Sequence, residues 1–284
     1  MFDFSEKSLA EIPVVVLDTE TTGLYVGQGD RLTEIGAVRL ENWQKVGKIS
    51  CLVNPQRPIS PQSIAISGIN QAQVDQAPNF AQIKPELDRL LDGALLVAHK
   101  AVFDAAFLGT EYALAQNQPP QIKTIHLPNP WLCTLTLARK YFNFGYNNLG
   151  NLARQLGVRM GKAHRALNDA LATAEVLRHL TNKLATDHKF RTVGDLLFAQ
   201  GEPIVAPPLP RVDLPERLAD ALAQGQTVRL LYTAQQTERW VTFTPRYAHR
   251  HRYVPYLIGR NHETGYDEAL QLHFILSAEL VETP

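Results

Sequence analysis

The sequence predicts an α/β domain followed by a small β domain. Short apolar runs alternate with helix-like stretches from Ile12 to about Leu184, prolines cluster between Glu202 and Pro215, and strand-like runs follow the prolines. A length of 284 residues agrees with two domains, because one hydrophobic core rarely grows much beyond ~250 residues. We expect one domain over residues 1–200, a linker over 201–215 and a second domain over 216–284.

Strands and helices alternate in the first domain. Apolar runs predict a three-stranded meander and then a buried strand, over Pro13 to Leu17, Leu32 to Leu40, Val46 to Val53, and Ala94 to Ala98. Apolar residues at helical spacing predict helices over Gln71 to Asp75, Asn79 to Leu91, Phe103 to Asn117, Trp131 to Tyr141, Leu149 to Leu156, and Ala166 to Leu184.

The second domain opens with a helix and continues as strands. The linker's prolines exclude a helix interior or a central strand there. Beyond them, the pattern predicts a helix over Pro215 to Gln224 and a hairpin turn over Asn261 to Tyr266. The predicted strands cover Thr227 to Thr233, Arg239 to Thr244, Tyr253 to Arg260, and Ala269 to Leu276.

The composition excludes several classes of protein. With 45% hydrophobic and 20% charged residues, the chain is neither disordered, collagen-like nor disulfide-rich. The 28 basic and 28 acidic side chains cancel, so any contact with nucleic acid must be local. Cys51 and Cys133 have no CxxC partner, which argues against a thiolate zinc site. The absence of a signal-like start or of a run of ~18 apolar residues predicts a cytoplasmic protein that does not contact membranes.

Two acids stand at the end of the first strand. Asp18 and Glu20 are two residues apart, so both point to one face and can bind one hard cation. Solvated acids at a strand end are the alternative. Asp104 at the start of one helix, and His164 with Asp169 at the start of another, favour a functional site.

These motifs resemble those of the DnaQ-like 3′–5′ exonucleases of the DEDDh branch. The similar segments are Asp18-Thr-Glu-Thr-Thr-Gly-Leu24, His99-Lys-Ala-Val-Phe-Asp104 and His164-Arg-Ala-Leu-Asn-Asp169-Ala. The intervening stretch Leu32-Thr-Glu-Ile-Gly-Ala-Val38 also matches. The resemblance covers residues 12–184 and implies an RNase H-like mixed sheet with flanking helices.

The resemblance also implies a mechanism. Asp18, Glu20, Asp104 and Asp169 are expected to hold two divalent ions, which stabilise the attacking and leaving oxygens of phosphodiester hydrolysis. Without metal, carboxylates this close repel one another, so we expect a divalent cation to be required. All-oxygen ligation favours Mg²⁺ or Mn²⁺. The His164 imidazole suits a general base that deprotonates the attacking water.

Substrate contacts are expected around the first and second motifs. The candidates are Thr21, Gly23, Leu24, His99, Lys100 and Phe103. In the family, the turn after the first motif touches the 3′-terminal nucleotide, and an aromatic ring can stack on the penultimate base. Core packing of Leu24 and Phe103 is the alternative. Lys100 stands where the family usually has asparagine, and it offers phosphate a point charge but no acceptor.

The C-terminal unit resembles the WYL domain, a small Sm/SH3-like β fold. The motif stands here as Pro255-Tyr-Leu257, with proline in place of tryptophan. The resemblance implies a module that senses nucleic acid or a nucleotide.

A basic and aromatic stretch precedes that motif. Arg246-Tyr-Ala-His-Arg-His-Arg-Tyr253 places Arg246, Arg250 and Arg252 beside tyrosines and histidines. Arginines meet phosphates, and rings stack on bases for roughly 1–3 kcal/mol each. A solvated sheet edge kept soluble by arginine is the alternative.

The leading hypothesis is a divalent-metal-dependent 3′–5′ exonuclease acting on single-stranded DNA or RNA 3′ ends or overhangs, with DNA favoured. It would trim ends in DNA repair, replication or CRISPR prespacer processing. A larger nucleic-acid-processing complex is a candidate partner. The alternative is a regulatory protein whose WYL-like domain binds nucleic acid. The intact acids and His164 favour the enzyme.

Overall fold

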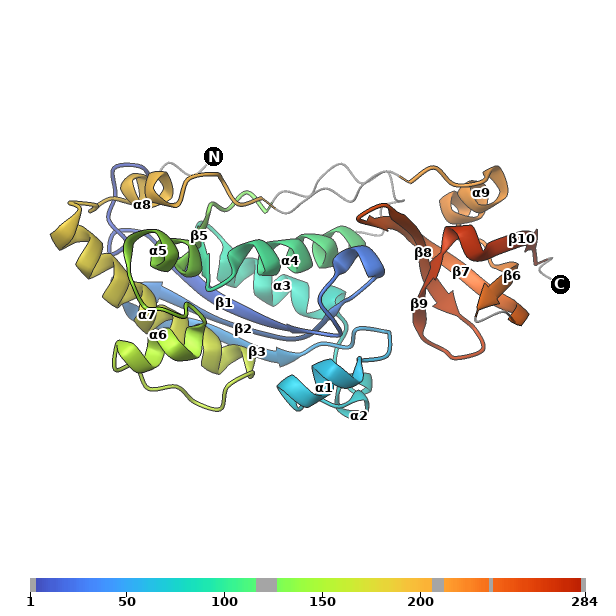
Figure 1. Cartoon of the computed structure of the whole chain (residues 1–284), viewed down its shortest axis with the longest axis horizontal. Helices are drawn as coiled ribbons and strands as arrows, with labels where there is room; N and C mark the ends of the chain where they lie inside the picture. The colour runs from blue at the N-terminus through green and yellow to red at the C-terminus, as the bar shows by residue number, and fades with distance from the viewer. Residues whose placement is uncertain (1–3, 116–126, 206–211, 235–236, 282–284) are drawn as a thin grey trace.

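The computed structural model describes residues 4–115, 127–205, 212–234 and 237–281 (Figure 1). The chain forms an α/β domain and, after the proline-rich segment, a smaller antiparallel β domain (Figure 1). The C-terminal residues predicted for helix Phe103 to Asn117 and part of the linker lie outside the described residues.

The α/β domain is built on a mixed sheet with the order β3-β2-β1-β4-β5. Its strands are β1 Val14–Thr21, β2 Leu32–Glu41, β3 Gln44–Leu52, β4 Leu95–Ala98 and β5 Trp131–Cys133. β1, β2 and β3 pair antiparallel as the predicted meander, while β4 and β5 add in parallel. This is the mixed RNase H-like sheet that the resemblance implied.

The predicted helix Trp131 to Tyr141 is wrong in its first turn. Trp131, Leu132 and Cys133 pair with β4 as strand β5, and the helix begins only at Thr134. All three residues of this strand are buried. A run of three apolar residues is too short to reveal a period of two, so it merged with the helical pattern after it.

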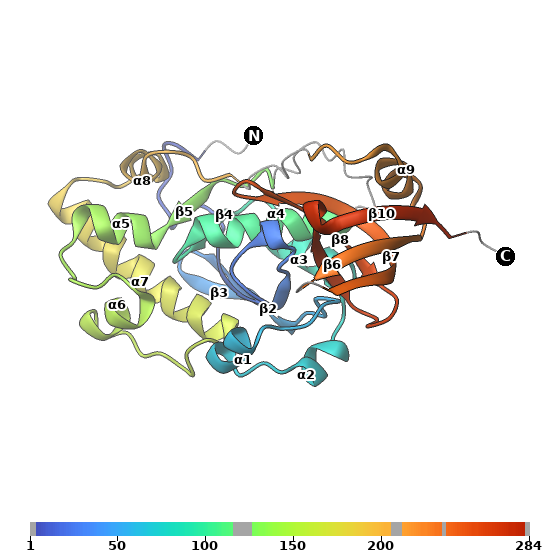
Figure 2. The same cartoon turned by 45° about the vertical axis from the view of Figure 1, so that its right-hand side comes forward.

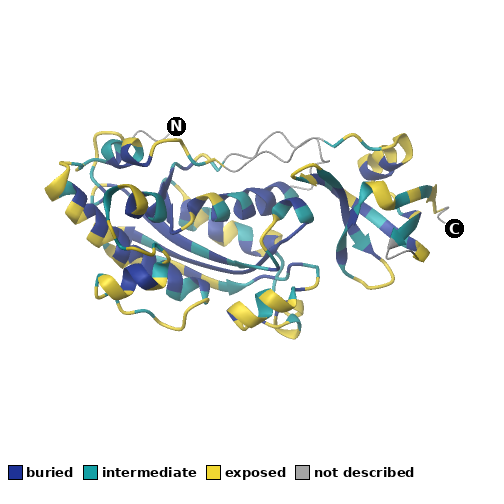
Figure 3. Ribbon diagram, in the orientation of Figure 1, coloured by how far each residue is buried: buried dark blue, intermediate teal, exposed yellow. Residues whose placement is uncertain are grey.

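Helices cover both faces of this sheet (Figure 3). The helices of this domain are α1 Pro61–Ser67, α2 Gln71–Asp75, α3 Phe80–Leu91, α4 Ala101–Ala115, α5 Thr134–Tyr141, α6 Leu149–Gln155, α7 Ala166–Asp187 and α8 Val193–Gln200, with the 3₁₀ turn η1 at Val26–Gln28. Val15 and Leu17 of β1 pack with α3 and α4, whereas Val14 and Val16 pack with α7. The sheet therefore lies between two helical layers.

The β domain consists of α9 Glu216–Gln224 and an antiparallel sheet with the order β10-β6-β7-β8-β9. Its strands are β6 Val228–Ala234, β7 Thr237–His251, β8 Val254–Asn261, β9 Asp267–Gln271 and β10 Ile275–Leu280. The predicted strand Ala269 to Leu276 is wrong, because the 3₁₀ turn η2 at Leu272–Phe274 divides it and sends β10 to the opposite sheet edge. β7 is also longer than predicted.

The two domains are joined through β7, β8 and β9. The Asp267 amide donates to the Gln56 carbonyl at 2.7 Å, and the rings of Tyr25 and His251 lie 4.4 Å apart. Tyr247 of β7 is buried in a small apolar cluster that Leu114 of α4 joins. Figure 2 shows the β7–β8 hairpin lying over the end of α4. Within the described ranges, no helix has the length and apolar character needed to cross a membrane.

Candidate active site

The carboxyl end of β1 carries the first two acids. Asp18 and Glu20 have the same parity along the strand as Val14 and Val16, whose side chains pack toward α7. Both acids therefore belong to the sheet face on which α7 begins. Glu20 pairs across the sheet with Glu34 of β2.

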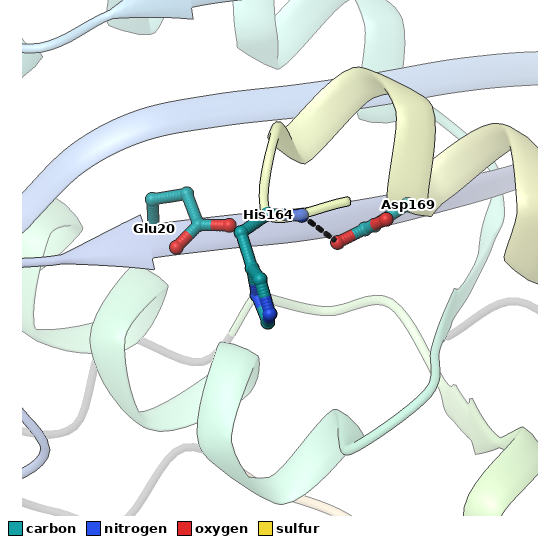
Figure 4. A group of neighbouring side chains, drawn as sticks. All are labelled: Glu20, His164 and Asp169. Atoms are coloured by element: carbon teal, nitrogen blue, oxygen red, sulfur yellow. Dashed lines mark hydrogen bonds between the residues drawn. The ribbon is translucent and has the colours of Figure 1, made fainter. Parts of the chain in front are cut away.

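The start of α7 brings the third motif to these acids. His164 has a positive φ of 58°, and its backbone N–H donates to Asp169 Oδ2 at 3.0 Å. Ligand atoms of Glu20, His164 and Asp169 all lie within 4.8 Å of one another (Figure 4). The imidazole is exposed, while Asp169 is buried. The turn therefore places a solvent-accessible histidine beside two carboxylates.

A buried glutamate that the motif analysis did not single out fixes this start of α7. Glu34 is only 2% exposed, and it pairs with Arg165 at 2.8 Å and accepts the Ala166 N–H at 3.0 Å. A carboxylate at a helix N-terminus also meets the favourable end of the helix dipole. An acid among the mostly apolar and small residues of the first half of β2 was the sequence signal that could have revealed it.

Close contact between β2 and α7 depends on a glycine. A Cβ on Gly36 would lie 2.0 Å from the Leu167 backbone nitrogen. Any side chain at this position would push α7, and with it Asp169, away from the sheet.

Asp104 completes the acidic group from the first turn of α4. It is 3% exposed, and the Thr19 hydroxyl donates to its Oδ1 at 2.8 Å. Thr19 lies between Asp18 and Glu20 on β1, so one strand positions all three carboxylates.

The electrostatics of the site favour protonated acids when no cation is present. Burial, followed by repulsion from Asp104 and Asp169, raises the pKa of Asp18 well above its ordinary value. Burial also raises the pKa of Glu20 to about 7 and that of Asp104 to about 7.

The fourth acid shows the same effect and has an oxygen without a partner. Burial is the largest cause of the raised pKa of Asp169, whose Oδ1 is buried and accepts no hydrogen bond from a described residue. A divalent cation would satisfy this oxygen and remove the repulsion among the acids, so the residues present fit such an ion.

Comparison with known proteins identifies the family. Residues 15–177 match the exonuclease family of the RNase T type. This chain belongs to that exonuclease family. The DnaQ-like domain implied by the three motifs is thereby confirmed over residues 15–177, and the α/β domain that contains it is called the exonuclease domain below.

Curated relatives are found among DNA polymerase III proteins. A DNA polymerase III subunit epsilon-like protein of Rhodobacter capsulatus is 38% identical over 185 residues, which are 62% of this chain and 25% of that protein. The DNA polymerase III subunit epsilon of Treponema pallidum is 34% identical over 168 residues, covering 58% of this chain and 74% of that one. This chain thus spans about a quarter of the first relative's length.

Two solved structures share the fold. Exonuclease X in complex with 5′ overhanging duplex DNA is 30% identical, with a TM-score of 0.51, covering 66% of this chain and 99% of that one. E. coli Exonuclease I in complex with a dT13 oligonucleotide is 15% identical, with a TM-score of 0.54, covering 87% of this chain and 55% of that one.

The turn after the first motif reaches the surface. The Thr21 hydroxyl donates to the Gly23 carbonyl at 2.5 Å, and a Cβ on Gly23 would lie 2.4 Å from Asp30 Oδ2. Leu24, the next residue, is 56% exposed. Glycine therefore lets this turn fold tightly onto Asp30 while Leu24 stays outside the core.

The second-motif candidates lie in different environments. Phe103 is half-buried against Phe107, and Lys100 Nζ lies 5.1 Å from the centre of its ring. His99, in contrast, is buried, with its ring nitrogens bonded to the Thr134 hydroxyl at 2.9 Å and the Asn147 carbonyl at 2.8 Å. The structure therefore gives His99 a positioning task between α5 and the loop before α6.

The three arginines of the basic stretch also differ in their contacts. Arg246 pairs with Asp267 at 3.0 Å and donates to the Gln56 side chain at 2.9 Å, so it joins the two domains. Arg250 and Arg252 are exposed and form no ion pair with a described residue. They are the arginines of this stretch that remain available to phosphate.

Proposed function

We propose that this exonuclease is a divalent-metal-dependent 3′–5′ enzyme that removes nucleotides from the 3′ ends of single strands or overhangs. The observation that carries the proposal is the gathering of the acidic side chains and His164 at the end of β1, where Asp169 Oδ1 is buried and has no hydrogen-bond partner among the described residues. Buried carboxylates with raised pKa values are typical of cation sites and active centres.

The acids hold the cations in this proposal. Asp18, Glu20, Asp104 and Asp169 would hold two Mg²⁺ or Mn²⁺ ions, and the charge of these ions would stabilise the attacking and leaving oxygens of the phosphodiester. His164, exposed beside Glu20 and Asp169, takes a proton from the attacking water. Thr19 holds Asp104 in place, and Glu34 holds the turn that carries His164 and Asp169.

DNA is the proposed substrate. The relatives named above are DNA polymerase III proteins, and Exonuclease X was solved with an overhanging DNA duplex. We propose that Leu24 and Phe103 contact the terminal bases and that Lys100 meets a phosphate. End trimming in DNA repair, replication or CRISPR prespacer processing, with partner proteins, is the proposed role.

We also propose that the second domain is a WYL-like, Sm/SH3-like module that faces nucleic acid. A helix followed by five antiparallel strands supports this proposal, as does the burial of Tyr256 and Leu257 of the motif in β8. The fold likeness to Exonuclease I covers 87% of this chain, which is more than residues 1–200 make up. That protein was solved with a dT13 oligonucleotide.

Digestion of matched single-stranded DNA and RNA, labelled at the 5′ end, tests the enzyme. We expect a ladder that shortens from the 3′ end with Mg²⁺ or Mn²⁺, is absent with EDTA and is lost in His164→Ala and Asp18→Ala. Circular dichroism checks that both variants are folded. Tight binding of the same strands without cleavage would refute the proposal and support the regulatory alternative.

A further inference from the structure

A pocket lies where the β domain meets the exonuclease domain. Its volume is about 190 Å³, and it lies among η1 and its preceding turn, α4 and the end of β7. The residues that line it include Leu24, Tyr25, Phe103, Phe107, Arg250 and His251. Its lining includes none of Asp18, Glu20, Asp104 and Asp169, so it is distinct from the proposed cation site.

The floor of this pocket is apolar and adjoins the active site. Phe103, Ala106 and Phe107 lie three and four residues apart on α4, so they share one face of that helix. Phe103 directly precedes Asp104, and Leu24 follows Glu20 by four residues. A strand whose 3′ end lies among the acids therefore has this floor within reach on its 5′ side.

The opposite wall belongs to the β domain and approaches closely. A Cβ on Gly27 would lie 2.7 Å from the Arg250 carbonyl oxygen, so the glycine permits the contact. The His251 ring lies against Tyr25 at 4.4 Å. The joint made by Asp267, Gln56 and Arg246 holds the β domain in this position.

The turn between β7 and β8 continues directly from Arg250 and His251 of the lining, and we call it the rim; it is positively charged and aromatic. Arg250 and Arg252 are exposed without an ion-pair partner in the described part of the chain, and Tyr253 is 95% exposed. Such a rim complements a phosphodiester backbone, since arginine meets phosphate and a bare ring offers a stacking surface.

We propose that this pocket binds one unstacked nucleobase of the substrate strand, on the 5′ side of the nucleotides being removed. Leu24 and Phe103 would then lie between this base and the terminal bases that the proposed function assigns to them. Its volume is below the ~300–1,000 Å³ of pockets that bury a drug-sized ligand, which suits a single base rather than a base pair. The β domain thereby selects strands that are unpaired at this position. The inference deepens the proposed function and rests on it.

A binding experiment in EDTA tests the pocket without requiring cleavage. Single-stranded DNA carries 2-aminopurine at successive positions from its 3′ end, and fluorescence reports which base enters a new environment. We expect a change confined to one internal position, lost in the double variant Arg250→Ala, His251→Ala. Arg239→Ala, an exposed arginine near the other end of β7, is the matched control. A change that survives in the double variant would overturn the proposal.

Kinetics supply the second readout. The ratio of kcat/KM for a long strand to kcat/KM for a dinucleotide should fall by about 5- to 150-fold in the double variant, the equivalent of one stacked base. Equal losses on both substrates would show that these residues only support the Leu24–Tyr25 turn, which would overturn the inference. Arg250→Gln, which leaves the Tyr25–His251 contact intact, replaces the double variant if that protein is unfolded.

The two proposals fail in different ways. If wild type binds 2-aminopurine at one position but cleaves nothing with Mg²⁺, the exonuclease proposal fails and the pocket stands. If wild type cleaves the long strand and the dinucleotide equally well, the pocket proposal fails and the exonuclease stands.

Discussion

Replacing Glu20 with glutamine should stabilise the cation-free protein at alkaline pH. Burial raises the pKa of Glu20 from its ordinary value of 4.5 to about 7. The folded state therefore binds this proton more tightly than the unfolded state, so its contribution to stability is full below pH 4.5 and is lost as the pH rises through 7.

The size of the effect follows from the two pKa values. At ~1.4 kcal/mol for each pKa unit, their difference corresponds to a loss of about 3 kcal/mol above pH 7. Glu20 is partly exposed, and screening by solvent keeps the measured value below this limit. Glutamine has no charge to lose, so the variant should escape this loss.

Urea unfolding in EDTA across the range from pH 4.5 to above 7 measures the effect. The free energies of unfolding of wild type and Glu20→Gln should nearly agree at the acid end and diverge in favour of the variant at the alkaline end. Excess Mg²⁺ should reverse the order, because wild type gains stability from cation binding. A variant that is less stable than wild type in EDTA at alkaline pH, or a difference independent of pH, would refute the reasoning.

Three further substitutions test how α7 is placed. Gly36→Ala should remove digestion and lower the free energy of unfolding by ~1–3 kcal/mol or more, since its Cβ would meet Leu167, whereas Gly150→Ala in α6, where only an Asn148 oxygen lies at 3.7 Å, should change neither. Glu34→Gln should weaken Mg²⁺ affinity about 10- to 100-fold in a titration of activity; unchanged affinity would contradict its positioning role. Asp169→Asn should abolish Mg²⁺-dependent cleavage with the circular dichroism spectrum preserved, and retained cleavage would remove Asp169 from the proposed cation site.

The sequence was informative wherever local pattern and chemistry coincide. The period of two along β1 already implied that Asp18 and Glu20 share a face, and the structure puts that face against α7. Glu34 escaped notice because its partner, Arg165, lies 131 residues away: the local pattern shows an acid in a strand but not what that acid binds. The sequence suggested Arg246 as a phosphate ligand, yet its guanidinium forms an ion pair with Asp267 of β9.

The sequence pattern also could not predict elements that are too short to show a periodic repeat of apolar residues. β5 is three residues long, and α1 begins at Pro61 beside a loop rich in proline, so neither offers a full repeat. The division of Ala269 to Leu276 into two strands depends on β10 pairing with β6, a contact between distant segments.

The joint between the domains means that each domain shields side chains of the other from water. Tyr247 is fully enclosed at this joint, and the Arg31–Glu111 ion pair of the exonuclease domain is buried beside it. Cutting the chain after residue 200 would uncover Leu114 and hydrate this pair. We therefore expect the nuclease half to have a lower free energy of unfolding alone than in the full chain.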